Sequence, residues 1–390
     1  MNQGCTPPAN GEQEYREPFM GELPGKLDAA PRADLARSDQ ARADQDGCPV
    51  RIFPLRRPEG HKVPIPRYSA ILPQQDKVAV LFLGVQATDA EALRGVEFAE
   101  LLAAGGDQAP VYADFASFAD PQGYLNRVAA LYWLKAGDFA AWSKLPAVAE
   151  WRARVSALSS VGLWWEPVAV DADYMETIAF KEFLRGFSGC PVSGFTTTEG
   201  TGYWGAARDR IPAAAYDLFE PAVVASEPVA GGSKIPYRKI QPPKNMAVIR
   251  SGVSWEHCAG EQLKDYQERI KPALDAGMDY LRNNPRDTGC FALRQVNCVS
   301  GAGDELAEAY SLGAFVSLAH LESWAKDHPS HLAIYTRAMA ARRKYQDQLQ
   351  LRTYNEIFIV EANNPPFEYF NCHSRTGLLP YSQMLASARA

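Results

Sequence analysis

Residues 77–86 read KVAVLFLGVQ, a continuous apolar run whose length suits one buried strand. The pattern of apolar residues then predicts the elements that follow: an amphipathic helix at 89–104, a strand at 126–134, a helix that begins at Asp138 and carries Trp142 and Trp151, and a strand at 162–170. Strands and helices succeed one another in this way where helices cover one face of an antiparallel sheet. The segment is therefore predicted to form one such layered unit.

A second, similar succession begins at Asn245. It comprises a strand at 246–255, a long helix at 261–283, strands at 290–299 and 309–317, and a helix after them. The residues also repeat weakly, because YWLKAGDFAAWSK at 132–144 resembles FVSLAHLESWAK at 315–326. The repeat predicts an α+β fold of tandem ferredoxin-like modules, forming an antiparallel β-barrel-like core flanked by helices, of the dimeric α/β-barrel type. Such a fold leaves a pocket between the sheet and its helices.

The chain divides into an N-terminal arm and one large domain. Residues 1–60 are rich in Pro, Gly, Ala, Asp and Arg and lack apolar periodicity, so the arm is expected to be extended or partly disordered. Residues 61–390 form the domain, with ferredoxin-like halves at about 77–175 and 245–365 and an insertion at 176–244 between them. The insertion mixes polar with aromatic residues, and long insertions of this kind often carry function.

Composition argues against several classes of partner. The net charge of −6 is unlike that of nucleic-acid-binding proteins, which present a basic surface. No apolar run approaches the ~20 residues that span a bilayer, so no membrane partner is expected. Seven cysteines without C-x-x-C spacing suit reduced thiols, and no signal peptide is visible, which together favour the cytoplasm. The expected partner is a small-molecule substrate.

Three of the six histidines fall in the run HLESWAKDHPSH, at 320, 328 and 331. A proline is best placed in the first turn of a helix, so Pro329 predicts that one helix ends near Asp327 and another begins at His328 or Pro329. His331 then projects from the first turns of the new helix. A neutral imidazole that enters an apolar pocket is a suitable axial ligand for haem iron, although a packed or surface histidine fits the same pattern.

Five segments, in order, resemble the aldoxime dehydratases, a family of haem-containing enzymes. They are GYWGAARDRIP at 202–212, IRSGVSW at 249–255, TGC at 288–290, SLAHLESWAKDHPSHLAIY at 317–335 and NCHSRTGLLP at 371–380. The resemblance covers roughly residues 77–380 and does not account for the N-terminal arm. It implies a haem-dependent lyase that acts on an N–O bond and dehydrates an aldoxime to a nitrile, and it implies a homodimer.

The resemblance also implies a role for each of several residues. It makes His331 the axial ligand of a b-type haem, whose ferrous iron binds the nitrogen of the aldoxime. On the opposite, distal side it makes Ser251 the donor to the departing hydroxyl group. Arg208 matches the distal arginine, with Arg210 as the alternative, and Glu176 matches an acidic residue that supports the network.

The sequence departs from the family at the distal histidine, whose place is taken by Asn355 in the run YNEI. An amide can form hydrogen bonds, but it cannot transfer a proton near neutral pH. Glu356, Tyr354 or water could relay protons instead, and His373 is a further candidate. Two alternatives therefore stay open: a haem enzyme acting on another N-oxygenated substrate, or a non-catalytic haem-binding or sensor protein. A protein of this fold without haem is the third.

Overall fold

The computed structural model describes residues 51–73, 77–229, 231–232 and 234–388. The N-terminal arm predicted at 1–60 therefore lies outside the described residues, except for 51–60. Eleven described strands form one sheet in the order β6-β12-β9-β11-β10-β3-β4-β2-β5-β13-β8, and every neighbouring pair is antiparallel. The thirteen described strands are β1 Tyr68–Ala70, β2 Lys77–Ala87, β3 Tyr112–Ala119, β4 Leu125–Trp133, β5 Gly162–Asp171, β6 Met175–Ile178, β7 Phe195–Thr197, β8 Lys234–Ile240, β9 Ala247–Ser254, β10 Cys290–Val299, β11 Glu305–Phe315, β12 Arg352–Ile359 and β13 Phe367–His373.

The sheet consists of two halves that meet edge to edge. Strands β2 to β5 make the first half, in the order β3-β4-β2-β5, and strands β9 to β12 make the second, in the order β12-β9-β11-β10. The halves are joined where β3 pairs with β10, over only three residue pairs. The succession of strands expected from the repeat is thus confirmed for β2, β4, β5, β9, β10 and β11, which lie within a few residues of their predicted places.

The expected closure into a barrel is wrong, because the sheet is open with β6 and β8 at its two edges. Strand β8 (KIPYRKI) contains a proline and the charged residues Lys234, Arg238 and Lys239, and most of the strand is exposed. Proline and exposed charges discourage further pairing of an edge strand. At the other edge β6 is only four residues long, and Tyr68 of β1 bridges to Ala179 just after it. Strands β6 and β8 therefore do not pair with each other, and the sheet stays open.

Ten α-helices are described, and most cover the sheet on its outside. They are α1 Ala99–Ala103, α2 Ala136–Trp142, α3 Pro146–Ser156, α4 Ala206–Arg210, α5 Gly260–Asp265, α6 Lys271–Asn283, α7 Pro285–Thr288, α8 Leu318–Asp327, α9 Pro329–Tyr345 and α10 Ser382–Ser387. The predicted long helix at 261–283 is confirmed as α5 and α6, joined by a π-helical turn at Tyr266–Ile270. The predicted break before Pro329 is confirmed, with α8 ending at Asp327.

Two predicted helices of the first half differ from the structure. The helix at 89–104 is wrong, since only a 3₁₀ turn at Glu91–Leu93 and the short α1 form there. Gly95 interrupts the stretch, and the apolar side chains around it reach the core from irregular backbone. The helix expected from Asp138 begins at Ala136 and is divided into α2 and α3, because Pro146 starts a new helix.

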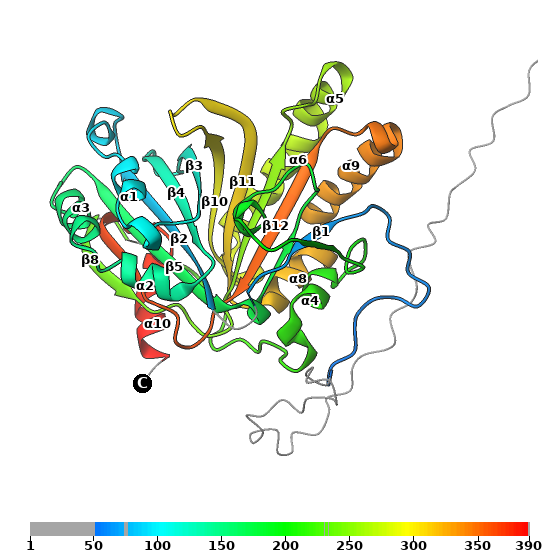
Figure 1. Ribbon diagram of the computed structural model, residues 1–390, viewed down its shortest axis with the longest axis horizontal. Helices are drawn as coiled ribbons and strands as arrows, with labels where there is room; N and C mark the ends of the chain where they lie inside the picture. The colour runs from blue at the N-terminus through cyan, green and yellow to red at the C-terminus, as the bar shows by residue number, and fades with distance from the viewer. Residues whose placement is uncertain (1–50, 74–76, 230, 233, 389–390) are drawn as a thin grey trace, which may run out of the picture.

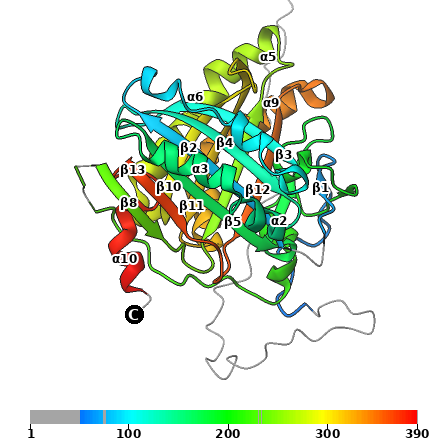
Figure 2. The ribbon, with the colours of Figure 1, turned by 60° about the vertical axis from the view of Figure 1, so that its left-hand side comes forward.

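Each half of the sheet has an outer face toward helices and an inner face toward the other half (Figure 1; Figure 2). Helices α1 to α3 cover the outer face of the first half, over a core that holds four tryptophans: Trp133, Trp142, Trp151 and Trp165. Helices α6 and α8 cover the outer face of the second half, and Ile334 of α9 packs onto the same core. The inner faces of both halves share the main core, with Phe82 from β2 and Phe358 from β12 in contact. Within the described residues, no helix is both long and apolar enough to cross a membrane.

Candidate functional site

The first turn of α9 is built by the His328-Pro-Ser-His331 run. His328 is the N-cap, and its Nδ1 accepts a hydrogen bond from the backbone nitrogen of Ser330 at 3.2 Å. Its ring stacks on Tyr280 of α6, with 3.9 Å between the ring centroids. Ser330 Oγ in turn accepts from Trp324 Nε1 at 3.1 Å, which ties α9 to α8. These contacts fix the turn from which His331 projects.

His331 lies between two tryptophans and has an unsatisfied nitrogen. Its ring meets Trp324 edge-on at 4.8 Å and Trp204 at 5.9 Å, measured between ring centroids. Burial lowers the pKa of His331, with the backbone of Ala325 acting in the opposite sense, so the neutral imidazole is favoured. Its Nδ1 atom is buried without a hydrogen-bond partner among the described residues. Trp204 also packs on Tyr335, one turn further along α9.

The outer face of the second half brings Ser251 and Asn355 side by side. They are directly paired across β9 and β12, so their side chains point to the same face, and Ile178 of β6 pairs with Asn355 on the other side. Although β9 is hydrogen-bonded on both edges, Ser251 and Ile249 stay partly exposed, as does Asn355. The side chains of Ser251 and Asn355 make no hydrogen bond within the part of the chain that the structure describes. The middle of this face is therefore left uncovered by α6, α8 and α9.

Glu176 stands on the same face, diagonal to Asn355. It pairs with Ile357 of β12, and diagonal neighbours in a sheet have Cα atoms about 7–8 Å apart. The Glu176 side chain is fully buried: Oε2 accepts from Arg210 Nε at 2.7 Å, whereas Oε1 has no partner among the described residues. The structure thus groups Glu176 with Ser251 and Asn355, and it links Arg210 to them.

Arg208 lies elsewhere. Its guanidinium group donates to both carboxylate oxygens of Glu322 on α8, at 2.8–3.2 Å, and to the carbonyl oxygen of Leu218 at 2.9 Å. Arg56 joins the same carboxylate at 3.0 Å. Arg208 therefore connects α4 to α8 and makes no contact with Glu176 in the described structure, whereas Arg210 does.

Arg67 is a residue of this region that the sequence patterns did not indicate. Its Nη2 donates to the carbonyl oxygen of Thr353 at 2.9 Å, two residues before Asn355. Burial, together with the like charge of Arg210, lowers the pKa of Arg67 to about 10, and Glu176 opposes this effect. The charge of Arg67 thus adds to that of Arg210 around the carboxylate. No motif marks it, because it precedes the segments that carry the family resemblance.

The other candidate proton donors face away from Asn355 or are engaged elsewhere. Tyr354 and Glu356 flank Asn355 on β12 and therefore point to the inner face. His373 Nε2 lies 2.8 Å from Asp120 Oδ2, in the first half of the fold. His320 Nδ1 lies 2.9 Å from Ser317 Oγ, within α8 and its N-cap. None of these four groups shares the face of Ser251.

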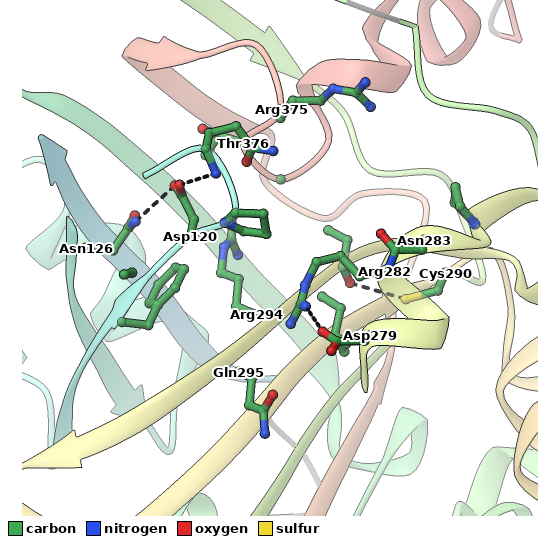
Figure 3. Close-up of a pocket in the computed structure, with 18 of the residues that line it drawn as sticks. Asp120, Asn126, Asp279, Arg282, Asn283, Cys290, Arg294, Gln295, Arg375 and Thr376 are labelled. Carbon is green, nitrogen blue, oxygen red and sulfur yellow. Dashed lines mark hydrogen bonds and ion pairs between the residues drawn. The ribbon is translucent and has the colours of Figure 1, made fainter. Parts of the chain in front are cut away.

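A cavity of about 780 Å³ opens at a different place, where the two halves part beyond the short pairing of β3 with β10. Figure 3 shows Asp120, Asn126 and Thr376 on one side of it and Asp279 and Arg282 on the other. These polar groups largely satisfy one another, since Asn126 donates to Asp120 at 3.2 Å and Arg282 pairs with Asp279. The cavity is lined by neither His331 nor any of the four predicted distal residues.

Comparison with known proteins decides the family. Residues 82–378 match the family described as haem-containing dehydratase. The aliphatic aldoxime dehydratase of Pseudomonas chlororaphis is 32% identical over 349 residues, which are 85% of this chain and 95% of that protein. The chain belongs to the haem-containing dehydratase family. The phenylacetaldoxime dehydratase of Bacillus sp. (strain OxB-1) is 29% identical over 281 residues, 70% of this chain and 79% of that protein.

The fold agrees with solved members of the family. A crystal structure of an aldoxime dehydratase superposes with a TM-score of 0.75 at 30% identity, covering 86% of this chain and 97% of the other. An aldoxime dehydratase crystallised with butyraldoxime gives a TM-score of 0.76 at 29% identity, covering 87% and 96%. The mixed architecture of helices on a large antiparallel sheet is therefore that of the family.

The residues present fit the cofactor of the family. A haem needs one strong axial ligand on the protein side, an apolar surround and open space on the other face of the iron. His331 supplies a neutral imidazole with an unsatisfied nitrogen, and Trp204 and Trp324 supply apolar walls. On the outer face of the sheet, Ser251 and Asn355 are only partly buried. A buried imidazole with an unsatisfied nitrogen between two tryptophans therefore fits the requirements of a haem ligand.

Proposed function

We propose that this chain is a haem-dependent lyase that dehydrates an aldoxime to a nitrile and water. The observation that carries the proposal is the position of His331, on the helical layer over the outer face that bears Ser251 and Asn355. The names of the related aldoxime dehydratases support the substrate class. The butyraldoxime complex of a protein with this fold supports a site large enough for an alkyl aldoxime.

His331 would hold the haem iron, and Ser251 would donate a hydrogen bond to the oxime oxygen as it leaves. Haem, when bound, supplies an iron that interacts with the oxime nitrogen. Loss of hydroxide is difficult unless the leaving oxygen receives a hydrogen bond or a proton, and Ser251 is paired directly with Asn355 on that face. Asn355 can orient the oxygen through its amide, but it cannot supply the proton.

Arg210 and Glu176 would organise charge beside Asn355. Arg210 is favoured over Arg208 as the distal arginine, because Arg210 contacts Glu176 whereas Arg208 is held by Glu322. Arg210 pairs with the buried Glu176 carboxylate, whose Oε1 has no partner among the described residues and can accept a hydrogen bond from water or substrate. Water ordered by this carboxylate would donate a proton to the leaving hydroxyl group, and the hydroxide that remains would take the proton from the oxime carbon, so that nitrile and water result.

The His331→Ala variant tests the proposal. The purified wild-type protein, expressed with ample haem supply, should show a Soret band and convert alkyl or aryl aldoximes to nitriles under anaerobic reducing conditions. His331→Ala should lose the band while the thermal unfolding midpoint of the apoprotein stays near that of the wild type. A full Soret absorbance in the variant would refute the ligand assignment, and a colourless wild-type protein would favour a fold that works without haem.

Asn355 favours a second candidate function. A haem protein without a distal histidine would bind aldoximes or other N-oxygenated compounds and dehydrate them slowly or not at all, as a sensor would. Anaerobic mixing of the reduced protein with aldoximes, ketoximes and hydroxamates distinguishes dehydration from binding alone. Spectral binding of an aldoxime without nitrile formation would support the second candidate.

The wider organisation of the protein is proposed as well. The strand orders of the two halves, each with its first strand between its third and fourth, support ferredoxin-like modules at about 77–175 and 245–365. We expect a homodimer, as the resemblance implies, and size-exclusion chromatography with light scattering tests it. The five described cysteines are all free and buried, which suits a reducing compartment such as the cytoplasm.

A further inference from the structure

Strands β9 and β12 carry charged residues on the face opposite the proposed distal residues. Side chains alternate along a strand, so Arg250 and Glu356 point to the inner face where Ser251 and Asn355 point to the outer one. Both inner residues are fully buried, with no exposed surface. The proposed reaction uses neither of them, and burying two charges so deeply is costly unless they are well paired.

Tyr132 joins these two charges. Arg250 Nη1 donates to the Tyr132 hydroxyl oxygen at 2.6 Å, and that hydroxyl donates to Glu356 Oε2 at 2.9 Å. Tyr132 is on β4, so the link crosses from the second half of the fold to the first. Asp114 of β3 adds a second crossing, with Oδ2 at 2.7 Å from Arg250 Nη2. We call Arg250, Tyr132 and Glu356 the inner brace.

The inner brace also fixes part of the insertion. Glu356 Oε1 accepts from the backbone nitrogen of Phe187 at 2.5 Å, next to Gly186, where any Cβ would clash with the carboxylate. The rings of Tyr310 and Tyr354 lie on the Arg250 guanidinium group, at 4.2 and 5.3 Å from its carbon to the ring centroids. Strands from both halves and one loop of the insertion therefore meet at these three side chains.

The register of β12 against β9 decides which side chains reach the outer face. A slip of β12 by one residue against β9 would turn Tyr354 or Glu356 to the outer face in place of Asn355. A smaller shift would change the spacing between Ser251 and Asn355 without exchanging them. The inner brace opposes both movements, because each would pull a buried charge away from its partner.

We propose that Arg250, Tyr132 and Glu356 are positioning residues that set the placement of Ser251 and Asn355 on the distal side of the haem. The inference rests on the proposed function, since it concerns the same distal face. It assigns a purpose to a buried charged group that apolar side chains could replace if stability alone were needed.

The fold provides a matched control for this brace. Arg294 of β10 donates to Glu166 of β5 at 2.6 and 2.7 Å, and the Tyr369 hydroxyl donates to the same carboxylate at 2.8 Å. This second group has the same chemistry and comparable burial in the same core. None of its three residues is on β9 or β12, so it cannot set the distal residues in the same way.

The experiment compares Tyr132→Phe with Tyr369→Phe in the haem-loaded protein, since each variant removes one buried hydroxyl. The probe is carbon monoxide on the reduced protein, because its C–O stretching frequency responds to hydrogen-bond donors on the distal side. We expect both variants to keep the wild-type haem content and to lose similar thermal stability. Only Tyr132→Phe should shift or broaden the C–O band, and its nitrile formation should fall up to about 100-fold, as for a 1 Å misplacement.

An unchanged C–O band in Tyr132→Phe, or an equal shift in Tyr369→Phe, would overturn the proposal. If Tyr132→Phe fails to fold, Arg250→Met and Arg294→Met form a second matched pair with the same expected contrast. The proposed function fails in a different way: a wild-type protein that binds haem and carbon monoxide but makes no nitrile would refute dehydration. The C–O band would still decide the role of the inner brace.

Discussion

Replacing His328 tests whether the first turn of α9 holds the haem ligand in place. In His328→Ala the helix loses its N-cap, which costs about 1 kcal/mol, and the stacked contact with Tyr280, which costs about 1 kcal/mol more. His331 lies in the turn that this cap closes, so loss of the cap destabilises the conformation in which the His331 imidazole is positioned to bind iron. A full coupling of ~2 kcal/mol corresponds to an affinity for haem about 30-fold lower.

The control is His328→Asn, because asparagine is among the best N-cap residues. This variant should retain the cap and lose only the contact with Tyr280, so its haem affinity should fall about fivefold. The assay follows the transfer of haem from each ferric protein to excess apomyoglobin by the change in the Soret band. Equal release rates for the wild type and His328→Ala, at a lower stability of the variant, would refute the reasoning. Equal rates for both variants would show that stacking, and not the cap, holds the ligand.

Three further predictions concern the distal residues Asn355 and Glu176 and the inner residue Glu356. Asn355→His should raise nitrile formation by about 10²–10⁴-fold in steady-state assays, as a general acid does, and an unchanged rate would mean that the acid is supplied elsewhere. Glu176→Gln should lower the free energy of unfolding by about 3 kcal/mol in urea titrations, because it leaves Arg210 buried without a counter-charge, and a loss below ~1 kcal/mol would contradict that picture. Burial raises the pKa of Glu356 from 4.5 to about 7, so the folded state binds this proton more tightly than the unfolded state does. The free energy of unfolding of the wild type should therefore fall by about 3 kcal/mol, relative to Glu356→Gln, as pH rises from 4.5 to 7. Equal pH profiles of the two proteins would contradict this assignment.

The strands of the sheet could be predicted because burial on both faces leaves continuous apolar runs. Strand β2 is buried at every position after Lys77, since helices cover one face and the other half of the fold covers the other. The missed strand β3 (YADFASFA) has small and polar residues at the junction of the halves, where it is only half-buried. The helix predicted at 89–104 does not form, although its apolar residues have helical spacing. Largely irregular backbone buries the same side chains in the core of the first half.

The candidate site could be predicted only where a local motif carries it. The place of His331 in the first turn of α9 follows from Pro329, whereas its role as a haem ligand is what the family resemblance implies. The neighbourhood of Ser251 and Asn355 depends on a pairing of strands about a hundred residues apart, and no local pattern indicates it. The choice between Arg208 and Arg210 depends on direction, since residues two apart on a helix point to nearly opposite sides and only one can reach Glu176.

The weak repeat places Trp142 and Trp324 at equivalent positions, but their surroundings differ between the two halves. Trp142 is sealed against Trp165, with 5.9 Å between their centroids, while its counterpart in the repeat, Trp324, lies against His331. The repeated tryptophan thus packs within the core of the first half, whereas in the second half it lies beside the histidine proposed to hold haem. During biosynthesis, the core of the first half would then form without haem, whereas the surroundings of His331 would be completed only when haem binds.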